Sequence, residues 1–131
     1  MTYRLYAFVN QYMATIQHGI QTAHVVAELF CKYRASAVLQ RWAEVDKTII
    51  ILCGGDNAAM YDLAKFLSAA PYPDAIFFES PDALNGLLTC CAVIVPEKLF
   101  GGTDLSDRYT GELTAWEAEF LERKEKCKLA I

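Results

Sequence analysis

Short runs of β-branched and aromatic residues alternate in this chain with longer segments of helical periodicity. The strand-like runs cover residues 3–9, 48–52, 74–78 and 89–95. The helix-like segments between them cover about 15–35, 37–45 and 57–69. This β-α-α-β-α-β-β order predicts an α/β fold, in which helices lie on both faces of a small, four-stranded mixed sheet.

Several local signals refine this prediction. The unbroken run Thr48–Leu52 is typical of a central strand that is covered on both faces. Thr15 is a plausible N-cap for the first helix, and Asp56 for the third. The third helix should place four residues inward, and the first shows apolar residues at helical spacing. These sets are Met60, Leu63, Ala64 and Leu67 in the third helix, and Ile16, Ile20, Ala23, Ala27, Phe30 and Cys31 in the first.

The carboxy-terminal part follows a break at Gly101-Gly102 and predicts a charged amphipathic helix over residues 112–128. Its apolar side carries Trp116 and Phe120, together with Leu113 and Leu121. Trp116 and Phe120 could pack on the sheet or on a second subunit. A homodimer is expected, since a sheet of four strands leaves edges to cover.

The length of 131 residues suits a single domain, with a core over 3–96 and a helical extension over 101–131. Twelve Lys and Arg against sixteen Asp and Glu give a net charge of −4. Proteins that hold a long phosphate backbone are usually basic, so tRNA is disfavoured as a partner. No apolar run reaches the roughly 18 residues of a membrane span, and the amino terminus does not resemble a signal peptide, so the expected location is cytoplasmic.

The cysteines at positions 31, 53, 90, 91 and 127 show no C-x-x-C spacing. Their apolar surroundings are typical of reduced core thiols, and no metal or other cofactor is expected. Cys90 and Cys91 begin a strand whose side chains alternate between faces, so the two cannot share one site.

Two short motifs occur at the start and end of the predicted core, Gln21-x-x-His24 in the first helix and Gly86-x-x-Thr89 before the last strand. Between them lie Leu39-Gln-Arg-Trp42, a Lys-Thr-Ile-Ile-Ile strand and a Tyr-Asp-Leu-Ala-Lys-Phe-Leu helix, and Pro96 closes the last strand. In this order the motifs resemble the archaeal and eukaryotic type of peptidyl-tRNA hydrolase, over residues 3–96. The resemblance implies the fold of that family and a metal-independent cleavage of the peptidyl-tRNA ester.

The chain departs from the family pattern at several positions. The family lysine falls on Gln17, and the Asp-Ala-Gly-x-Thr-Gln segment is replaced by residues 79–84. Glu79 is the closest counterpart of the family aspartate, with Asp82 as a second candidate, and Thr89 matches the second threonine of Gly-Thr-x-Thr. The stretch from Thr89 to Pro96 is one residue longer than in the family pattern, which could mean a β-bulge. The resemblance therefore carries over His24, Glu79 and Thr89 as catalytic candidates, without the lysine.

The residues themselves give a parallel hypothesis. Gln17, Gln21, His24 and Glu28 form one polar stripe on the first helix, close to the carboxyl end of the first strand. Open α/β sheets bind ligands in that region, and His24 could act as a base. The alternative is an ordinary solvated face. His18 could supply a positive charge, but a surface role is favoured.

Two loops are further candidates. Asn10, Gln11 and Tyr12 could bind a base or ring, and a purely structural role is equally compatible with them. Gly54-Gly55-Asp56-Asn57 could cradle a phosphate, but a tight turn capped by Asp56 is favoured.

Three functional hypotheses follow. The first is a divergent relative of the peptidyl-tRNA hydrolases that binds a small nucleotide-like or phosphate-bearing ligand without efficient hydrolysis. The second is an active peptidyl-tRNA hydrolase with a rearranged site. The third is a protein-interaction module that uses the carboxy-terminal helix. The missing lysine, the rewritten segment after Glu79 and the acidic charge favour the first.

Overall fold

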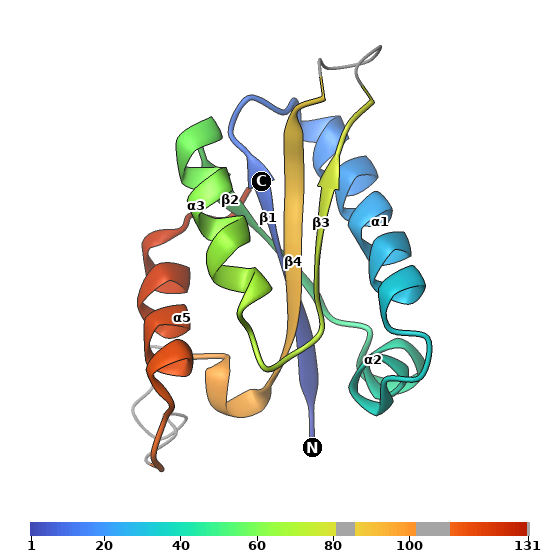
Figure 1. The fold of residues 1–131 in the computed structure, drawn as a ribbon, viewed down its shortest axis with the longest axis vertical. Helices are drawn as coiled ribbons and strands as arrows, with labels where there is room; N and C mark the ends of the chain where they lie inside the picture. Colours follow the sequence, from blue (N-terminus) through green and yellow to red (C-terminus); the bar gives the residue numbers. More distant parts are fainter. Residues whose placement is uncertain (81–85, 102–110, 131) are drawn as a thin grey trace.

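The computed structural model describes residues 1–80, 86–101 and 111–130 (Figure 1). Within these ranges a four-stranded sheet has the order β2-β1-β4-β3. Its strands are β1 (Tyr3–Asn10), β2 (Ile49–Gly55), β3 (Asp74–Phe78) and β4 (Leu88–Pro96). β1 is parallel to β2 and antiparallel to β4, and β4 is antiparallel to β3. The prediction of an α/β fold with a mixed sheet of four strands is confirmed.

Helices cover both faces of the sheet. They are α1 (Thr15–Lys32), α2 (Ala37–Arg41) with the π-helical turn η1 (Trp42–Asp46), α3 (Asn57–Ser68), the 3-10 turn η2 (Glu97–Leu99) and α5 (Ala115–Lys126). α1 and α2 lie on one face, whereas α3 and α5 lie on the other (Figure 1). Among the described residues, no helix has the length and apolar character needed to cross a membrane.

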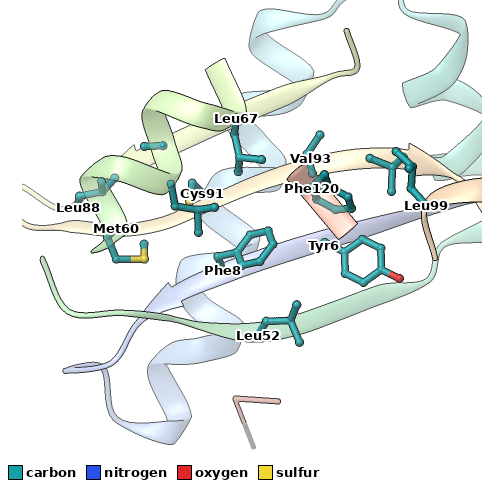
Figure 2. Packing of buried hydrophobic residues seen from close by; sticks show 13 residues of the cluster. Tyr6, Phe8, Leu52, Met60, Leu67, Leu88, Cys91, Val93, Leu99 and Phe120 are labelled. Carbon is teal, nitrogen blue, oxygen red and sulfur yellow. The ribbon is translucent and has the colours of Figure 1, made fainter. Parts of the chain in front are cut away.

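The two central strands, β1 and β4, separate two apolar cores. In β1, Leu5 faces the core under α1 and α2, while Tyr6 and Phe8 face the core under α3 and α5. Figure 2 shows this second core, in which Phe8 of β1 belongs to one cluster with Met60 of α3 and Phe120 of α5. Cys90 and Cys91 fall in different cores, as the alternation of a strand requires.

The predicted start and inner face of α3 are confirmed. The Asp56 carboxylate accepts the Ala59 backbone N–H at 2.9 Å, and the four predicted residues of α3 are its buried ones. A Cβ on Gly54 would come within 2.3 Å of Met60 Sδ, so glycine permits α3 to approach the sheet closely. The loop at residues 54–57 is thus a capped tight turn.

The carboxy-terminal helix α5 packs on its own sheet. Its capping box joins Thr114 and Glu117, and the helix covers 115–126 rather than the wider predicted range 112–128. Phe120 is 1% exposed, and the Trp116 ring stacks on Phe66 and Phe120 at centroid distances of 4.9 and 5.4 Å. Of the two predicted alternatives, packing on the sheet is the one observed.

β2 is an edge strand, so the prediction that residues 48–52 form a central strand is wrong. The chain that follows α5 covers this edge: the Cys53 N–H donates to Lys128 O at 2.8 Å, and the Ala130 N–H donates to Ile51 O at 3.0 Å. A β-branched run indicates that the faces of a strand are covered, and it carries no information about the hydrogen-bonding edges.

The predicted boundaries and apolar face of α1 are corrected. The N-cap is Ala14 rather than Thr15, and the helix ends at Lys32, short of position 35. Its buried residues are Gln21, Thr22, Val25 and Leu29. The predicted apolar stripe lies on the solvent side, and Cys31 there is exposed rather than a core thiol. Both faces of α1 carry apolar residues, and the hydrogen bond that buried Gln21 accepts from Thr89 is made only with the observed face inward.

Candidate functional site

A β-bulge at the start of β4 determines where Thr89 points. Phe77 of β3 lies opposite Cys90, but Phe78 lies opposite Leu88, so Thr89 is the extra residue of β4. Its hydroxyl group lies within 3.4 Å of Phe77 O and within 2.7 Å of Gln21 Oε1 on α1. The bulge expected from the length of this stretch is present, and it turns a polar side chain toward the helix.

Gln21 is the centre of the site. Its side-chain nitrogen donates to Glu79 Oε2 at 3.0 Å and to Gln17 Oε1 at 3.1 Å. Its oxygen accepts the Thr89 hydroxyl, and the residue is only 1% exposed. Every polar group of this buried amide is therefore engaged, so Gln21 holds one fixed orientation.

Glu79 is the acidic group at the surface end of this network. The hydrogen bond from Gln21 lowers the pKa of the Glu79 carboxyl below its ordinary value, and the Ser80 backbone N–H and the charge of His24 act in the same direction. The Ser80 N–H lies 3.0 Å from Glu79 Oε1. Because the pKa is lowered, Glu79 is ionised at neutral pH.

His24 lies on α1 three residues after Gln21, on the side of the helix that approaches Glu79. Its imidazole stacks on the Phe77 ring, with centroids 4.5 Å apart and 17° between the planes. The residue is exposed, and its charge interacts with the Glu79 carboxylate. The site thus pairs an oriented carboxylate with an imidazole that is supported from one side by an aromatic ring.

The structure brings together most of the predicted polar stripe and the catalytic candidates. Gln21 contacts Glu79 and Thr89 directly, and His24 approaches Glu79. Thr89 is 0% exposed, so its hydroxyl positions Gln21 inside the sheet rather than meeting a ligand. Gln21 is likewise a buried connector, not part of a solvated face.

Gln17, at the position where the predicted resemblance would put a lysine, carries an amide. Gln17 is half-buried, and its side-chain oxygen accepts a hydrogen bond from the Gln21 amide. The hydrogen bonds of Gln21, Glu79 and Thr89 within the described ranges go to amide, carboxylate, hydroxyl and backbone groups, and none involves Lys or Arg. A fixed cation that would stabilise an oxyanion is therefore missing from this part of the site.

The loop after β1 has a mainly structural residue at its start. Asn10 is buried, and its amide donates to Asn57 Oδ1 at 2.7 Å and to Leu88 O at 3.2 Å. Its oxygen accepts the Tyr12 backbone N–H at 3.0 Å. Gln11 and Tyr12 remain exposed, the latter at 64%. Asp82, the second acidic candidate, lies outside the described residues.

His18 is half-buried, so it lies only partly at the surface. Its Nε2 lies 3.2 Å from the Met13 carbonyl oxygen, which can only accept a hydrogen bond. Its Nδ1 is buried, with no hydrogen-bond partner among the described residues.

Sequence reasoning did not find Phe77, which supports His24. The available signal was its place in a predicted strand two residues before Glu79, where side chains point to the same face. Within the described ranges, no three His, Cys, Asp or Glu residues gather closely enough to bind a metal ion.

A scan of the chain against models of protein families gave no match, and a search of curated proteins found no relative. The relation to the peptidyl-tRNA hydrolases stays a prediction from the order of the motifs.

Proposed function

We propose that this chain is a divergent relative of the peptidyl-tRNA hydrolases that binds a small nucleotide-like ligand without efficient hydrolysis. The observation that carries the proposal is the fixed Gln21 amide, which presents the Glu79 carboxylate to solvent beside His24. Groups that are oriented before binding lower the entropic cost of binding a ligand.

The chemistry of the site favours hydroxyl and amino groups of a ligand. An ionised carboxylate accepts hydrogen bonds, so Glu79 suits the ribose hydroxyls or an exocyclic amine of a base. Exposed Tyr12 supplies a ring for stacking. No side chain of the described residues caps α1, so the N–H groups of Thr15 and Ile16 in its first turn offer a place for a phosphate group.

The same geometry explains why hydrolysis would be slow. Ester cleavage needs an activated water and a group that stabilises the negative charge on oxygen in the transition state. Gln17 occupies the position of the lysine that the family has. Thr89 is turned inward, and Glu79 would repel a developing oxyanion.

Calorimetric titration with nucleoside 5′-monophosphates tests the binding proposal. Glu79→Gln removes the charge but keeps the shape, and a charged acceptor binds a donor more strongly than a neutral one, so affinity should fall by about tenfold or more. The matched control is Glu122→Gln on α5, where the side chain is 68% exposed. Equal affinities of the two variants, or no heat with any nucleotide, would contradict the proposal.

Peptidyl-tRNA hydrolysis is the second candidate. It is favoured by the proximity of His24 to an ionised carboxylate, because such a carboxylate increases the ability of an imidazole to take a proton from water. A turnover assay on peptidyl-tRNA in the presence of a chelator decides between the two candidates. Clear cleavage that is lost in His24→Ala would replace the binding proposal.

We also propose a homodimer in the cytoplasm, and the five free cysteines support a reducing compartment. The third hypothesis, an interaction module, loses the surface first expected for it, because Trp116 and Phe120 of α5 belong to the internal core. An interaction surface therefore has to lie on another element.

A further inference from the structure

One stripe of the solvent-facing side of α1 is apolar from Ile16 to Phe30, beside a flank that carries His24 and Glu28. Ile16 is 76% exposed, Ile20 43% and Phe30 40%. Gly19, Ala23 and Ala27 on the same side are also exposed. The outer face of a helix in a monomeric protein is normally polar, so this face is typical of an interface.

No charge interrupts this face, which we define as Ile16, Gly19, Ile20, Ala23, Ala27 and Phe30. The carboxylate and the ammonium of α1 belong to Glu28 and Lys32. Lys32 pairs with Asp74 at 3.2 Å, and Glu28 lies on the flank that carries His24. A partner for the α1 face therefore needs to be uncharged as well, and a second copy of the same face meets that condition.

The other surfaces at which two copies could join are less suitable. The edge of β2 is already covered by residues 128–130. β3 forms the other edge of the sheet, but it has only five residues. Short edge strands resist pairing with another chain.

The α1 face is symmetric about Ala23 except at Ile20, whose counterpart three positions after Ala23, Val26, is half-buried and lies off the face. Counting from Ala23, small residues lie four positions away on each side, at Gly19 and Ala27. Large residues lie seven positions away, at Ile16 and Phe30. From this pattern we propose that α1 pairs with α1 of a second copy, antiparallel, across a two-fold axis at Ala23. A two-fold interface requires a self-complementary patch, which the symmetric spacing supplies.

The sizes of the side chains suit such a crossing. Small residues at the centre allow two helices to approach closely, while Ile16 of one copy reaches Phe30 of the other near the ends. A Cβ built on Gly19 would meet nothing within 4 Å, so the fold of a single chain does not require glycine there. A glycine at this position would allow a second helix to approach α1 closely.

The size of the face predicts a reversible dimer. An 18-residue helix is about 27 Å long and about 10 Å wide, which is less than the roughly 800 Å² per partner of a standard interface. We therefore expect a dissociation constant on the order of micromolar rather than an obligate dimer.

Pairing of this kind would also arrange the candidate sites. His24 follows Ala23 on the flank of α1, and a two-fold axis across the helix leaves that flank on the same side in both copies. The two His24–Glu79 sites would then open to one side of the dimer. The pairing itself does not depend on the proposed nucleotide binding.

Sedimentation of the full chain across a concentration series tests the pairing. The wild type should change from monomer to dimer mass, and Ala23→Glu should remain monomeric because it places a charge at the crossing point. The matched control is Ala118→Glu, at an exposed position of α5. It should dimerise like the wild type, with both variants keeping the wild-type thermal transition.

Cross-linking tests the position of the axis. In a Cys31→Ser background, Ala23→Cys should form an intermolecular disulfide under mild oxidation, because a residue on a two-fold axis meets its own copy. Ala118→Cys should not. A wild type that is monomeric up to on the order of 100 μM, or a dimer that Ala23→Glu leaves intact, would overturn the proposal.

Discussion

The buried amide of Gln21 donates to the partly exposed carboxylate of Glu79 at 3.0 Å, and this contact joins the interior of the sheet to its surface. On the inner side, the same amide accepts the hydroxyl of Thr89. The bulge in β4 orients Thr89, Thr89 orients Gln21, and Gln21 in turn orients Glu79. A substitution of Thr89 should therefore affect the orientation of Glu79, and a substitution of Glu79 should affect the hydrogen bond of Thr89.

Replacing Gln21 with Met should raise the pKa of Glu79 toward its ordinary value. Met has a similar length but no N–H, so the largest cause of the lowered pKa is lost. A carboxyl whose pKa is lowered by folding stabilises the fold above its ordinary pKa, and that contribution is lost as the pH falls through the lowered value. Carboxyl NMR titration of both proteins measures the change.

Glu117 is the internal control for this titration. It lies on α5, on the opposite face of the sheet, with a pKa of about 2. That value should stay the same in Gln21→Met. An unchanged pKa of Glu79 in a folded variant would show that the hydrogen bond from Gln21 does not determine its charge.

Thr89→Val should destabilise the protein by about 1–3 kcal/mol, because it leaves the buried oxygen of Gln21 without its donor. Val keeps the β-branched shape, so packing in β4 changes little. Urea denaturation measures the effect. Thr48→Val, at an exposed position, is the matched control and should stay within about 0.5 kcal/mol of the wild type. Equal stabilities of the two variants would contradict the buried hydrogen bond.

The parts of the fold that follow from local signals were predictable. Asp56 caps α3, and the inner residues of that helix follow a single apolar stripe. α1 is different, because Val25 and Leu29 compete with Ile16, Ile20 and Phe30 for the inward side. The choice depends on which polar neighbours find partners, and Thr89 lies 68 residues away from Gln21. A local pattern carries no information about such a partner.

The candidate site was predictable to a similar extent. The motif order selected Gln21, His24, Glu79 and Thr89, which the structure places together. The distinction between residues that face solvent and those that only support them was not predictable, because it depends on burial. Thr89 and Asn10 were expected to act on a ligand, but both are 0% exposed and bond within the protein.

Glu117 should make the fold sensitive to acid. Burial alone would raise the pKa of its carboxyl, but the Lys98 ammonium at 2.8 Å, the Thr114 backbone N–H and the Tyr72 hydroxyl hold it at about 2. Its stabilisation is complete above the ordinary carboxyl pKa and is lost as the pH falls toward 2. Thermal unfolding at several pH values measures this loss.

Glu117→Gln should destabilise the protein at neutral pH by about 1.5–3 kcal/mol, since hydrogen bonds to a charged acceptor are replaced by weaker ones. It should also flatten the acid dependence between pH 4.5 and about 2. Glu122→Gln removes only an exposed pair with Lys126 and should cost less than about 0.5 kcal/mol. A wild-type acid profile in Glu117→Gln would assign the acid sensitivity to other groups.

Cysteine labelling should separate the thiols by their position in the fold. Cys31 is exposed and should react with iodoacetamide first. Cys90 and Cys91 are 0% exposed, and burial raises the pKa of Cys90 to about 12 and that of Cys91 well above its ordinary value. The thiolate is the nucleophile, so both thiols should react only when the chain opens. Their labelling should be at least about a thousandfold slower than that of Cys31.

Peptide mass spectrometry after timed alkylation resolves the five sites, and the protein in denaturant gives the reference rates. Cys127 is half-buried, and burial also raises its pKa, so it should fall between the two groups. Rapid labelling of Cys90 in the native protein would mean that the start of β4 opens readily. Thr89 directly precedes Cys90 in the bulge, so the same opening would break the hydrogen bond between Thr89 and Gln21. Gln21 would then no longer hold Glu79 in one orientation.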